Sequence, residues 1–564
     1  SASFATDWVE LNVACEACHG PGERHVSLAR SGQLTGAANS GFATHLAERG
    51  SWAWPAGDPI ARRQQPLHGS RQVEACGRCH ARRGTLGEYQ HGRDLLDTHR
   101  LSLLEQNLYH DDGQVLDEVY VYGSFVQSAM YQAGVVCSNC HEPHTARLRA
   151  EGNAVCSQCH VAATYDDPGH HHHPVGSAGA SCANCHMPET TYMVVDPRRD
   201  HSMRVPRPDL SVVIGTPNAC NACHTDRDAQ WSLAALRSWG VEFSDTGDHP
   251  ARAFHQARQG DGRSVPALAQ LAADGDLPSI VRASAQVELG EFASREALDS
   301  GRRLLTSPDP MLRMAAVRSL AFLPPQQLLP LLAPLLDDPV TAVRMEVARA
   351  LSAVPPAQLQ PPLGSRLQAL LDEYLAVLSR HADMPGVQLQ LAAFFLARQQ
   401  PVPAEQAYRQ ALALNPQLLP ALLNLADLYR QLGREADARQ LLMEAVRIAP
   451  GQGSGHHALG LLETRAGNRE AALASLRRAA ELEQAGVRHR YVYAIALYDG
   501  GDTQAAINQL RQLLRLAPDN PDILLALVTY HREAGQAGEA KRYAERLLRL
   551  APDNPGYRQL YDSL

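Results

Sequence analysis

The sequence predicts a mainly α-helical protein in which a loop-rich N-terminal part is followed by an α-solenoid. Three observations predict this architecture. All 12 cysteines lie between residues 15 and 223, in a segment with little sustained helical or strand periodicity. A repeat of 31 residues then appears, and a repeat of 34 residues takes over from about residue 385. Repeats of such lengths are typical of stacked helix pairs.

Composition limits the classes of protein that the chain can belong to. It has 564 residues, a length typical of about three to four domains. Hydrophobic residues make up 45% and charged residues 20%, which is ordinary for a globular protein. A net charge of -8 argues against an electrostatic nucleic-acid binder. No apolar run approaches the ~18 residues that a membrane span needs.

Every cysteine belongs to a Cys-x-x-Cys pair, and a histidine follows each pair directly. The six copies are Cys15-Cys18-His19, Cys76-Cys79-His80, Cys137-Cys140-His141, Cys156-Cys159-His160, Cys182-Cys185-His186 and Cys220-Cys223-His224. This motif is the attachment signature of c-type haem, in which two thioethers hold the vinyl groups and the histidine binds the iron. Zinc sites and disulfides are the alternatives, but zinc would not need a histidine after every pair. The motifs predict six covalently bound haem c groups.

Residues 1–230 are therefore expected to form a loop-rich multihaem cytochrome c domain. The segment is rich in glycine, proline and short polar stretches such as Gly20-Pro21-Gly22. A chain packed around large porphyrins needs few long helices, because the porphyrin faces supply much of the core. We expect short helices that carry the motifs, joined by long ordered loops.

The second axial ligand of each iron is expected to be another histidine. Twelve histidines of this region lie outside the motifs, so the supply permits two per iron. His25 and His144 follow motif histidines too closely to cap their own irons, but either one can cap a neighbour. We select one member of the run at 170, His173, together with His201, and rank the stretch from His91 to His110 next. The selected distal ligands are His25, His144, His173, His201, His91 and His110.

Other candidates for the sixth position are weaker. His45 and His68 are equally well explained as surface histidines, and the His170–His173 run is also able to bind a metal at the surface. Methionine ligation would raise a reduction potential. The methionines of this region are better explained as packing residues; they are Met130, Met187, Met193 and Met203.

The first repeat predicts helix pairs over residues 263–384, after a junction at 231–262. Arg282, Arg313 and Arg344 are 31 residues apart. Six residues before each arginine stands a residue that favours a helix N-cap: Asp276, Ser307 and Asp338. Pro308 and Pro339 are expected at the first helical position. This pattern resembles HEAT repeats.

The second repeat predicts five tetratricopeptide (TPR) repeats over residues 385–564. Three phases recur every 34 residues: alanines that let two helices approach, glycines that make the turn, and prolines that start the next repeat. They are Ala404, Ala438, Ala472, Ala506 and Ala540; Gly433, Gly467, Gly501 and Gly535; and Pro416, Pro450, Pro518 and Pro552, with Gln484 as the one miss. Such a solenoid offers an extended surface for a partner protein.

Several segments resemble those of exported multihaem cytochromes with C-terminal TPR repeats. They are Cys15–Gly22, Asp117–Phe125, Cys137–His144 and His201–Asp209. The haem part looks related to the tetrahaem cytochromes of ammonia oxidation and to multihaem nitrite and hydroxylamine enzymes. In that family His25, His144, His201 and a histidine of the 170 run fall at distal ligand positions. The resemblance implies a periplasmic or extracellular location. Relatives carry further motifs upstream, and no export signal is visible, so we expect residues before Ser1.

The functional expectation is electron transfer along closely spaced haems, with the solenoid docking a redox partner or further copies of the chain, including a haem-chain filament. The alternative is an oxidoreductase that acts on a small nitrogen or sulfur compound at one open-site haem. The chain has no Cys-x-x-Cys-Lys motif of the kind found in related nitrite reductases. A third reading gives the haems a mainly structural role within a scaffold. We expect no nucleic-acid partner and no membrane span. We favour the role of an electron carrier over that of a catalyst.

Overall fold

The computed structural model describes residues 13–34, 40–67, 69–243, 249–482 and 486–564. It is mainly helical and ends in a helical-repeat solenoid, which confirms the predicted fold class. The chain forms two compact units, which divide between Val377 and Leu378. Within the described residues, no helix is both long and apolar enough to cross a membrane.

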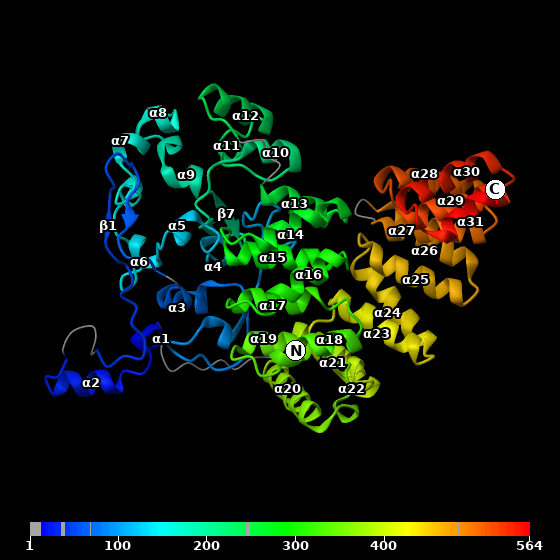
Figure 1. The fold of residues 1–564 in the computed structure, drawn as a ribbon, viewed down its shortest axis with the longest axis horizontal. Coiled ribbons are helices and arrows are strands. Elements are labelled where there is room, and N and C mark those ends of the chain that lie inside the picture. The colour runs from blue at the N-terminus through cyan, green and yellow to red at the C-terminus, as the bar shows by residue number, and fades with distance from the viewer. Residues whose placement is uncertain (1–12, 35–39, 68, 244–248, 483–485) are drawn as a thin grey trace. The chain divides into compact units, whose positions relative to one another are not determined.

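The N-terminal part consists of short elements joined by loops (Figure 1). Its helices are α1 (Cys15–His19), α2 (Glu23–Arg30), α3 (Arg71–His80), α4 (Tyr122–Phe125), α5 (Ala129–Gln132), α6 (Cys137–Cys140), α7 (Ala162–Tyr165), α8 (Pro168–His171), α9 (Cys182–His186), α10 (Pro208–Ile214), α11 (Ala219–Cys223) and α12 (Ala229–Ser238). Short 3-10 turns lie at η2 (Leu95–Asp97), η3 (Gly152–Val155) and η4 (Ala178–Ala180).

Four two-stranded antiparallel hairpins complete this part. They are β1 (Trp52–Ala53) with β2 (Arg62–Arg63), β3 (Arg83–Thr85) with β4 (His99–Leu101), β5 (His141–Glu142) with β6 (Arg147–Leu148), and β7 (Glu189–Tyr192) with β8 (Asp196–Arg199). Hairpins this short have little stability of their own in water and depend on what packs against them.

The first solenoid segment is a stack of helices in the same compact unit (Figure 1). The helices are α13 (Pro250–Arg258), α14 (Val265–Ala273), α15 (Ser279–Gly290), α16 (Arg295–Leu304), α17 (Pro310–Ser319), α18 (Pro325–Leu332), α19 (Thr341–Ala350) and α20 (Pro361–Arg380), with 3-10 turns η6 (Gly262–Ser264), η7 (Ala333–Leu335) and η8 (Pro356–Gln358). The three repeated arginines lie in α15, α17 and α19. Arg313 pairs with the buried Asp338 of the next repeat at 2.8 Å, and Arg344 pairs with Glu373 at 2.7 Å.

The predicted helix starts in this segment are wrong by two residues. The N-caps are Pro278, Asp309 and Val340, rather than Asp276, Ser307 and Asp338. Pro308 and Pro339 accordingly precede the helices. Asp338 instead accepts a hydrogen bond from the backbone N–H of Val340 and binds Arg313. An inter-repeat ion pair therefore uses the carboxylate that the sequence pattern assigned to a cap.

The arginine-rich face of this stack holds the N-terminal part in place. Arg258 of α13 has a side chain only 3% exposed, and it donates to Asp111 at 2.9 Å and to Glu288 at 3.0 Å. It also donates to the carbonyl oxygen of Leu104, whose own N–H donates to Ser284 of α15. The buried side chains of the N-terminal part gather in the adjoining segment 95–126, among them Leu95, Leu103, Tyr109, Val119 and Phe125.

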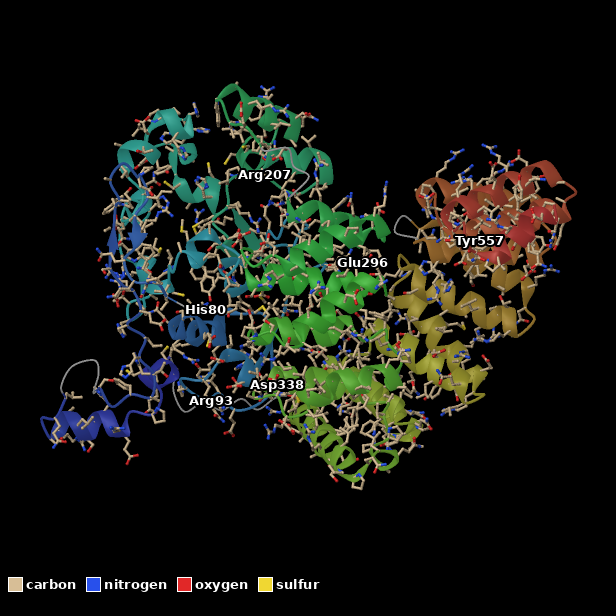
Figure 2. The ribbon with its side chains drawn as sticks, viewed as in Figure 1. His80, Arg93, Arg207, Glu296, Asp338 and Tyr557 are labelled. Carbon is tan, nitrogen blue, oxygen red and sulfur yellow. The ribbon has the colours of Figure 1, made fainter. Side chains whose placement is uncertain are left out.

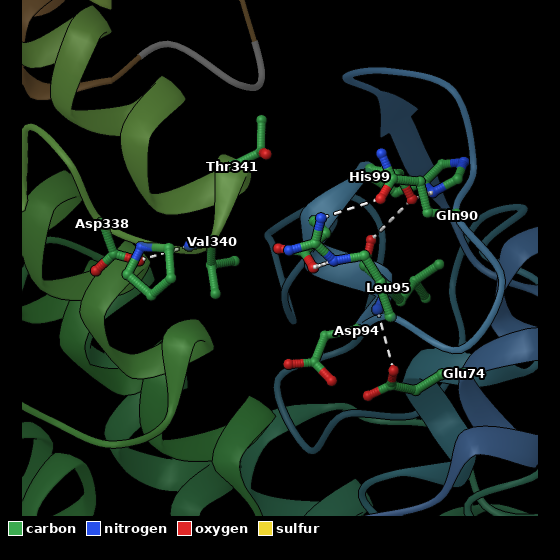
Figure 3. Close-up of polar contacts among 12 residues, drawn as sticks. Glu74, Gln90, Asp94, Leu95, His99, Asp338, Val340 and Thr341 are labelled. Atoms are coloured by element: carbon green, nitrogen blue, oxygen red, sulfur yellow. Dashed lines mark hydrogen bonds and ion pairs between the residues drawn. The ribbon is translucent and has the colours of Figure 1, made fainter.

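A second contact joins the same segment to the start of α19. The Asp97 carboxylate accepts from the backbone N–H of Thr341. Figure 3 shows this region, with Leu95 donating to Glu74 of α3 at 3.0 Å. Burial, together with the nearby Asp94 carboxylate, raises the pKa of Glu74 to about 7. The helix that ends in the second motif is thus tied through η2 to the repeat stack.

Residues 378–564 form the second unit from regular antiparallel helix pairs. The helices are α21 (Pro385–Ala397), α22 (Pro401–Leu414), α23 (Leu419–Gln431), α24 (Glu435–Ile448), α25 (Gly453–Arg465), α26 (Arg469–Glu481), α27 (Val487–Asp499), α28 (Thr503–Leu516), α29 (Pro521–Glu533), α30 (Ala537–Leu550) and α31 (Pro555–Asp562). The five phased alanines are all buried. Gly433, Gly467, Gly501 and Gly535 all have positive φ, between 73° and 85°, which confirms the predicted glycine turns.

We predict that Arg258→Met destabilises the N-terminal unit by about 3 kcal/mol, because the change removes the buried guanidinium that binds the partly buried Asp111 and Glu288 carboxylates, of which Asp111 keeps only His255. Denaturant unfolding of the haem-loaded protein measures the effect. Arg263→Met is the matched control, since that side chain is 86% exposed. Equal stability of the two variants would contradict the importance of this network.

Candidate haem attachment sites

Each motif occupies a single helical turn or the end of a helix. Four lie in or directly after the short helices α1, α6, α9 and α11, the second forms the last turns of α3, and the fourth follows η3 as a turn. His80 at the end of α3 is labelled in Figure 2. A helical turn places residues three and four apart on one face. The two thiols and the imidazole of each motif therefore point toward a common side.

The described cysteines are all free thiols. Among the described residues, no three His, Cys, Asp or Glu side chains come together as a group able to hold a metal ion. A structural zinc site needs four such ligands, so the zinc alternative finds no support in this arrangement. An iron in a porphyrin needs only the axial ligands from the protein.

The segment that carries the fourth and fifth motifs has almost no core of its own. From residue 141 to residue 199 the only buried residue is Ala180. The segment nevertheless adopts defined turns and hairpins. A chain with so few buried side chains cannot offset its conformational entropy by itself. These residues fit large apolar groups that would fill the space between them.

Four motif histidines face a second imidazole across a gap of uniform width. The ring centres are 6.2 to 6.4 Å apart, and the ring planes are inclined by 10° to 39°. The pairs are His19 with His144, His141 with His201, His186 with His170, and His224 with His173. Rings at this separation do not touch, so direct stacking does not explain the pairs.

The width of the gap fits a metal ion held between two imidazoles. Metal–imidazole bonds are about 2 Å long, and each ring centre lies about 1 Å beyond its nitrogen, which puts the centres of two axial rings about 6 Å apart. The four observed separations match that value. The residues present thus fit bis-histidine ligation of an iron at each of these four positions.

Hydrogen bonds at Nδ1 leave Nε2 free to bind a metal. His186 donates to the carbonyl oxygen of Arg204 at 2.6 Å, His201 donates to that of Arg199 at 2.9 Å, and His173 donates to that of His171. His144 uses the Glu142 carboxylate at 3.1 Å. Since these oxygens only accept, the proton stays on Nδ1. Metal-bound histidines are oriented by such bonds.

Burial keeps several of these imidazoles in the neutral form that binds metals. It lowers the pKa of His201, of His141 and of His170. It also lowers the pKa of His19, with smaller contributions from His144 and His25. Neutral imidazole is the ligand form, so the lowered pKa values suit these four imidazoles to coordinate.

The structure does not bring every selected histidine opposite a motif histidine. His25 donates to the carbonyl oxygen of Ser40 at 2.6 Å and stacks on Phe42. His91 packs edge-on against Tyr89, and its buried Nδ1 has no hydrogen-bond partner. His110 lines a cavity of about 400 Å³ that also includes Cys185. These three remain predictions.

Two motif histidines lack a comparable partner among the described residues. His160 has the Tyr165 ring edge-on at 5.5 Å, and His80 forms no such ring pair. His68 lies outside the described residues. Conversely, the sequence-based choice of His173 missed His170, which faces His186. Helix α8 ends at His171 and His172 has a left-handed backbone, so His170 and His173 lie on either side of a change in chain direction. The run of four histidines itself was the available signal that more than one member reaches a site.

Known family models match three parts of the chain. A family model of the doubled CXXCH motif matches residues 130–164, which hold the third and fourth motifs. HEAT-repeat models match residues 265–352 and 301–376, and TPR models match 395–462, 457–521 and 497–564. The paired motif indicates covalent haem c binding and electron transfer, and the repeats indicate protein interaction. No match was found among curated proteins.

Several solved structures are similar to part of this chain. A crystal structure of the MamA protein is 19% identical, covering 31% of this chain and 94% of its own, with a TM-score of 0.28. YrrB, described as a TPR protein with an unusual peptide-binding site, is 17% identical over 34% and 97%, with a TM-score of 0.28. PilF of Pseudomonas aeruginosa is 20% identical over 39% and 99%, with a TM-score of 0.29.

We predict that His201→Ala converts one low-spin iron of the haem-loaded protein to a high-spin, five-coordinate iron, because the imidazole that faces His141 is removed. Electron paramagnetic resonance of the oxidised protein detects the change. His201→Met should restore six-coordination at a raised potential, a response that a purely structural role would not produce. His456→Ala, in the TPR unit, is the control. An unchanged spectrum of His201→Ala would refute the assignment of His201.

Proposed function

We propose that the chain is an electron-transfer cytochrome that carries six covalently bound haem c groups. The observation that carries this proposal is the set of four histidine pairs, each spaced for an iron between two Nε2 atoms. When bound, haem supplies a one-electron redox couple. An iron with two protein ligands has no vacant position for a substrate.

The chain's own residues fix the axial ligands and shield them. Carbonyl and carboxylate acceptors hold the imidazoles in one tautomer and orientation, so little rearrangement accompanies a change in iron charge. Two imidazoles favour a lower potential than a histidine–methionine pair. The Arg258 network keeps the supporting segment fixed against the repeat stack.

We further propose that the TPR unit binds a redox partner or another copy of the chain, with filament formation as one form of self-assembly. Stacked TPR pairs offer an extended surface for such contacts. A periplasmic or extracellular location belongs to the same proposal, because haem is attached to this motif outside the cytoplasm. We also propose that the haem part is related to the tetrahaem cytochromes of ammonia oxidation and to multihaem nitrite and hydroxylamine enzymes.

A second candidate function is the reduction or oxidation of a small nitrogen or sulfur compound. The observation in its favour is that His80 and His160 face no second imidazole among the described residues. An iron bound at either position on one side alone would accept a small ligand on the other side. The four paired positions offer no such site.

We predict an intact mass equal to the chain plus six haems, and low-spin irons that nitrite and hydroxylamine leave unchanged. Denaturing mass spectrometry counts the haems, and paramagnetic resonance with and without each compound reads the irons. A measured mass with six haems shows that a signal absent from the paramagnetic resonance spectrum is not due to loss of haem. A high-spin iron that shifts when either compound is added would favour the second candidate, and fewer than six haems would contradict the first.

A further inference from the structure

Neighbouring motifs in the sequence are also neighbours in space, beginning with the first two. Arg78, between the two cysteines of the second motif, donates to the carbonyl oxygen of Ala17 in the first motif at 3.2 Å. The Cys18 thiol lies close enough to Cys76 and Cys79 to interact with them electrostatically. The first and second attachment sites therefore adjoin.

The second and third motifs are joined still more directly. Helices α3 and α6 pack together, and the backbone N–H of Ser138 in α6 donates to the side-chain oxygen of Gln72 in α3 at 2.8 Å. The thiols of Cys76 and Cys137 hydrogen-bond to each other. The second and third motifs thus each place one haem-attachment sulfur next to a sulfur of the other motif.

The hairpin β1–β2 and its flanks connect the third motif to the fourth. Asn139 of the third motif donates to the carbonyl oxygen of Arg49 at 3.0 Å, just before the hairpin. Ala61, just before β2, donates its backbone N–H to the carbonyl oxygen of Cys159 at 2.8 Å. The thiol of Cys140 lies within range of an electrostatic interaction with that of Cys159.

Asn153 connects the fourth motif to the fifth. Its side chain donates to the carbonyl oxygen of Ala180 at 2.8 Å and accepts from the backbone N–H of Cys182 at 3.0 Å. The thiols of Cys156 and Cys182 are neighbours. This junction repeats the thiol–thiol contact between the second and third motifs.

The fifth and sixth motifs meet through packing of α9 against α11. Cys185 lies near both Cys220 and Cys223. Within the described residues, each thiol contact between different motifs joins two that are successive in the sequence. Cys15 and Cys223, at the two extremes of the series, are exposed, as is Cys79 of the second motif.

We propose that the attached haems follow one another in space in the order of their motifs, so that they form one unbranched electron path from Cys15–His19 to the motif at Cys220–His224. This order rests on the proposed function. A one-electron donor protein is oxidised at one exposed end, each iron alternates between the ferric and ferrous states, and a one-electron acceptor protein is reduced at the other end. Both external partners are redox proteins that dock at the ends of the series.

Electron arrival times at three marked irons test the order. Arg24, exposed beside the first motif, is replaced by cysteine and labelled with a ruthenium photosensitiser after haem attachment, when the native thiols are blocked. A distal methionine then makes one iron the high-potential trap. The variants His201→Met, His170→Met and His173→Met mark the third, fifth and sixth sites in turn. Redox titration verifies each trap before the kinetics.

Arrival of the photoinjected electron should slow from the third trap to the fifth and again to the sixth. Earlier arrival at the sixth trap than at the third would overturn the order. Removal of the fourth haem by Cys156→Ala with Cys159→Ala should abolish fast arrival at the sixth trap, while arrival at the third trap is retained as the matched control. Unchanged arrival at the sixth trap would also overturn the order. Uptake of electrons in any other order would leave the proposed function intact.

Discussion

The separation of about 6 Å between the ring centres of facing imidazoles is the constraint on which the N-terminal part depends. Each gap joins a motif histidine to a histidine from a distant or neighbouring loop. His144, which follows the third motif, reaches the first, and His201, which follows the fifth, reaches the third. Axial ligation across these gaps would tie together loops that share few buried side chains of their own.

The repeat stack provides the stability that this part lacks. Between residues 95 and 126 the chain buries large side chains, and Arg258 fastens that segment to α13 and α15 through carboxylates and a backbone carbonyl. Residues 141–199, by contrast, bury only Ala180. A conventional core anchors one side of the N-terminal part, and the groups held by the motifs would complete the other side.

Local patterns predicted the fold well, because they depend on residues close in sequence. The phased glycines had to make left-handed turns, and all four have positive φ. The attachment motifs needed only a helical turn. The cap of α19 was misplaced because Asp338 forms an inter-repeat ion pair with Arg313, a contact that no local pattern encodes. Before α17 the capping side chain is Asp309, two residues after the predicted Ser307.

The distal histidines show where the sequence stops being sufficient. His144, His173 and His201 were placed opposite motif histidines by the fold, but His170 was passed over, since only the three-dimensional path of the chain assigns two members of one run to two sites. The selection of His91 and His110 rested on their place, with His99, in one short stretch of the sequence. Whether such residues face an iron depends on loops that follow no periodic pattern.

Iron-edge anomalous diffraction from crystals of the haem-loaded protein tests the central claim most directly. An anomalous peak should lie midway between the rings of each pair: His19 and His144, His141 and His201, His186 and His170, and His224 and His173. Iron peaks placed away from these midpoints, or rings in contact with no metal between them, would contradict the account.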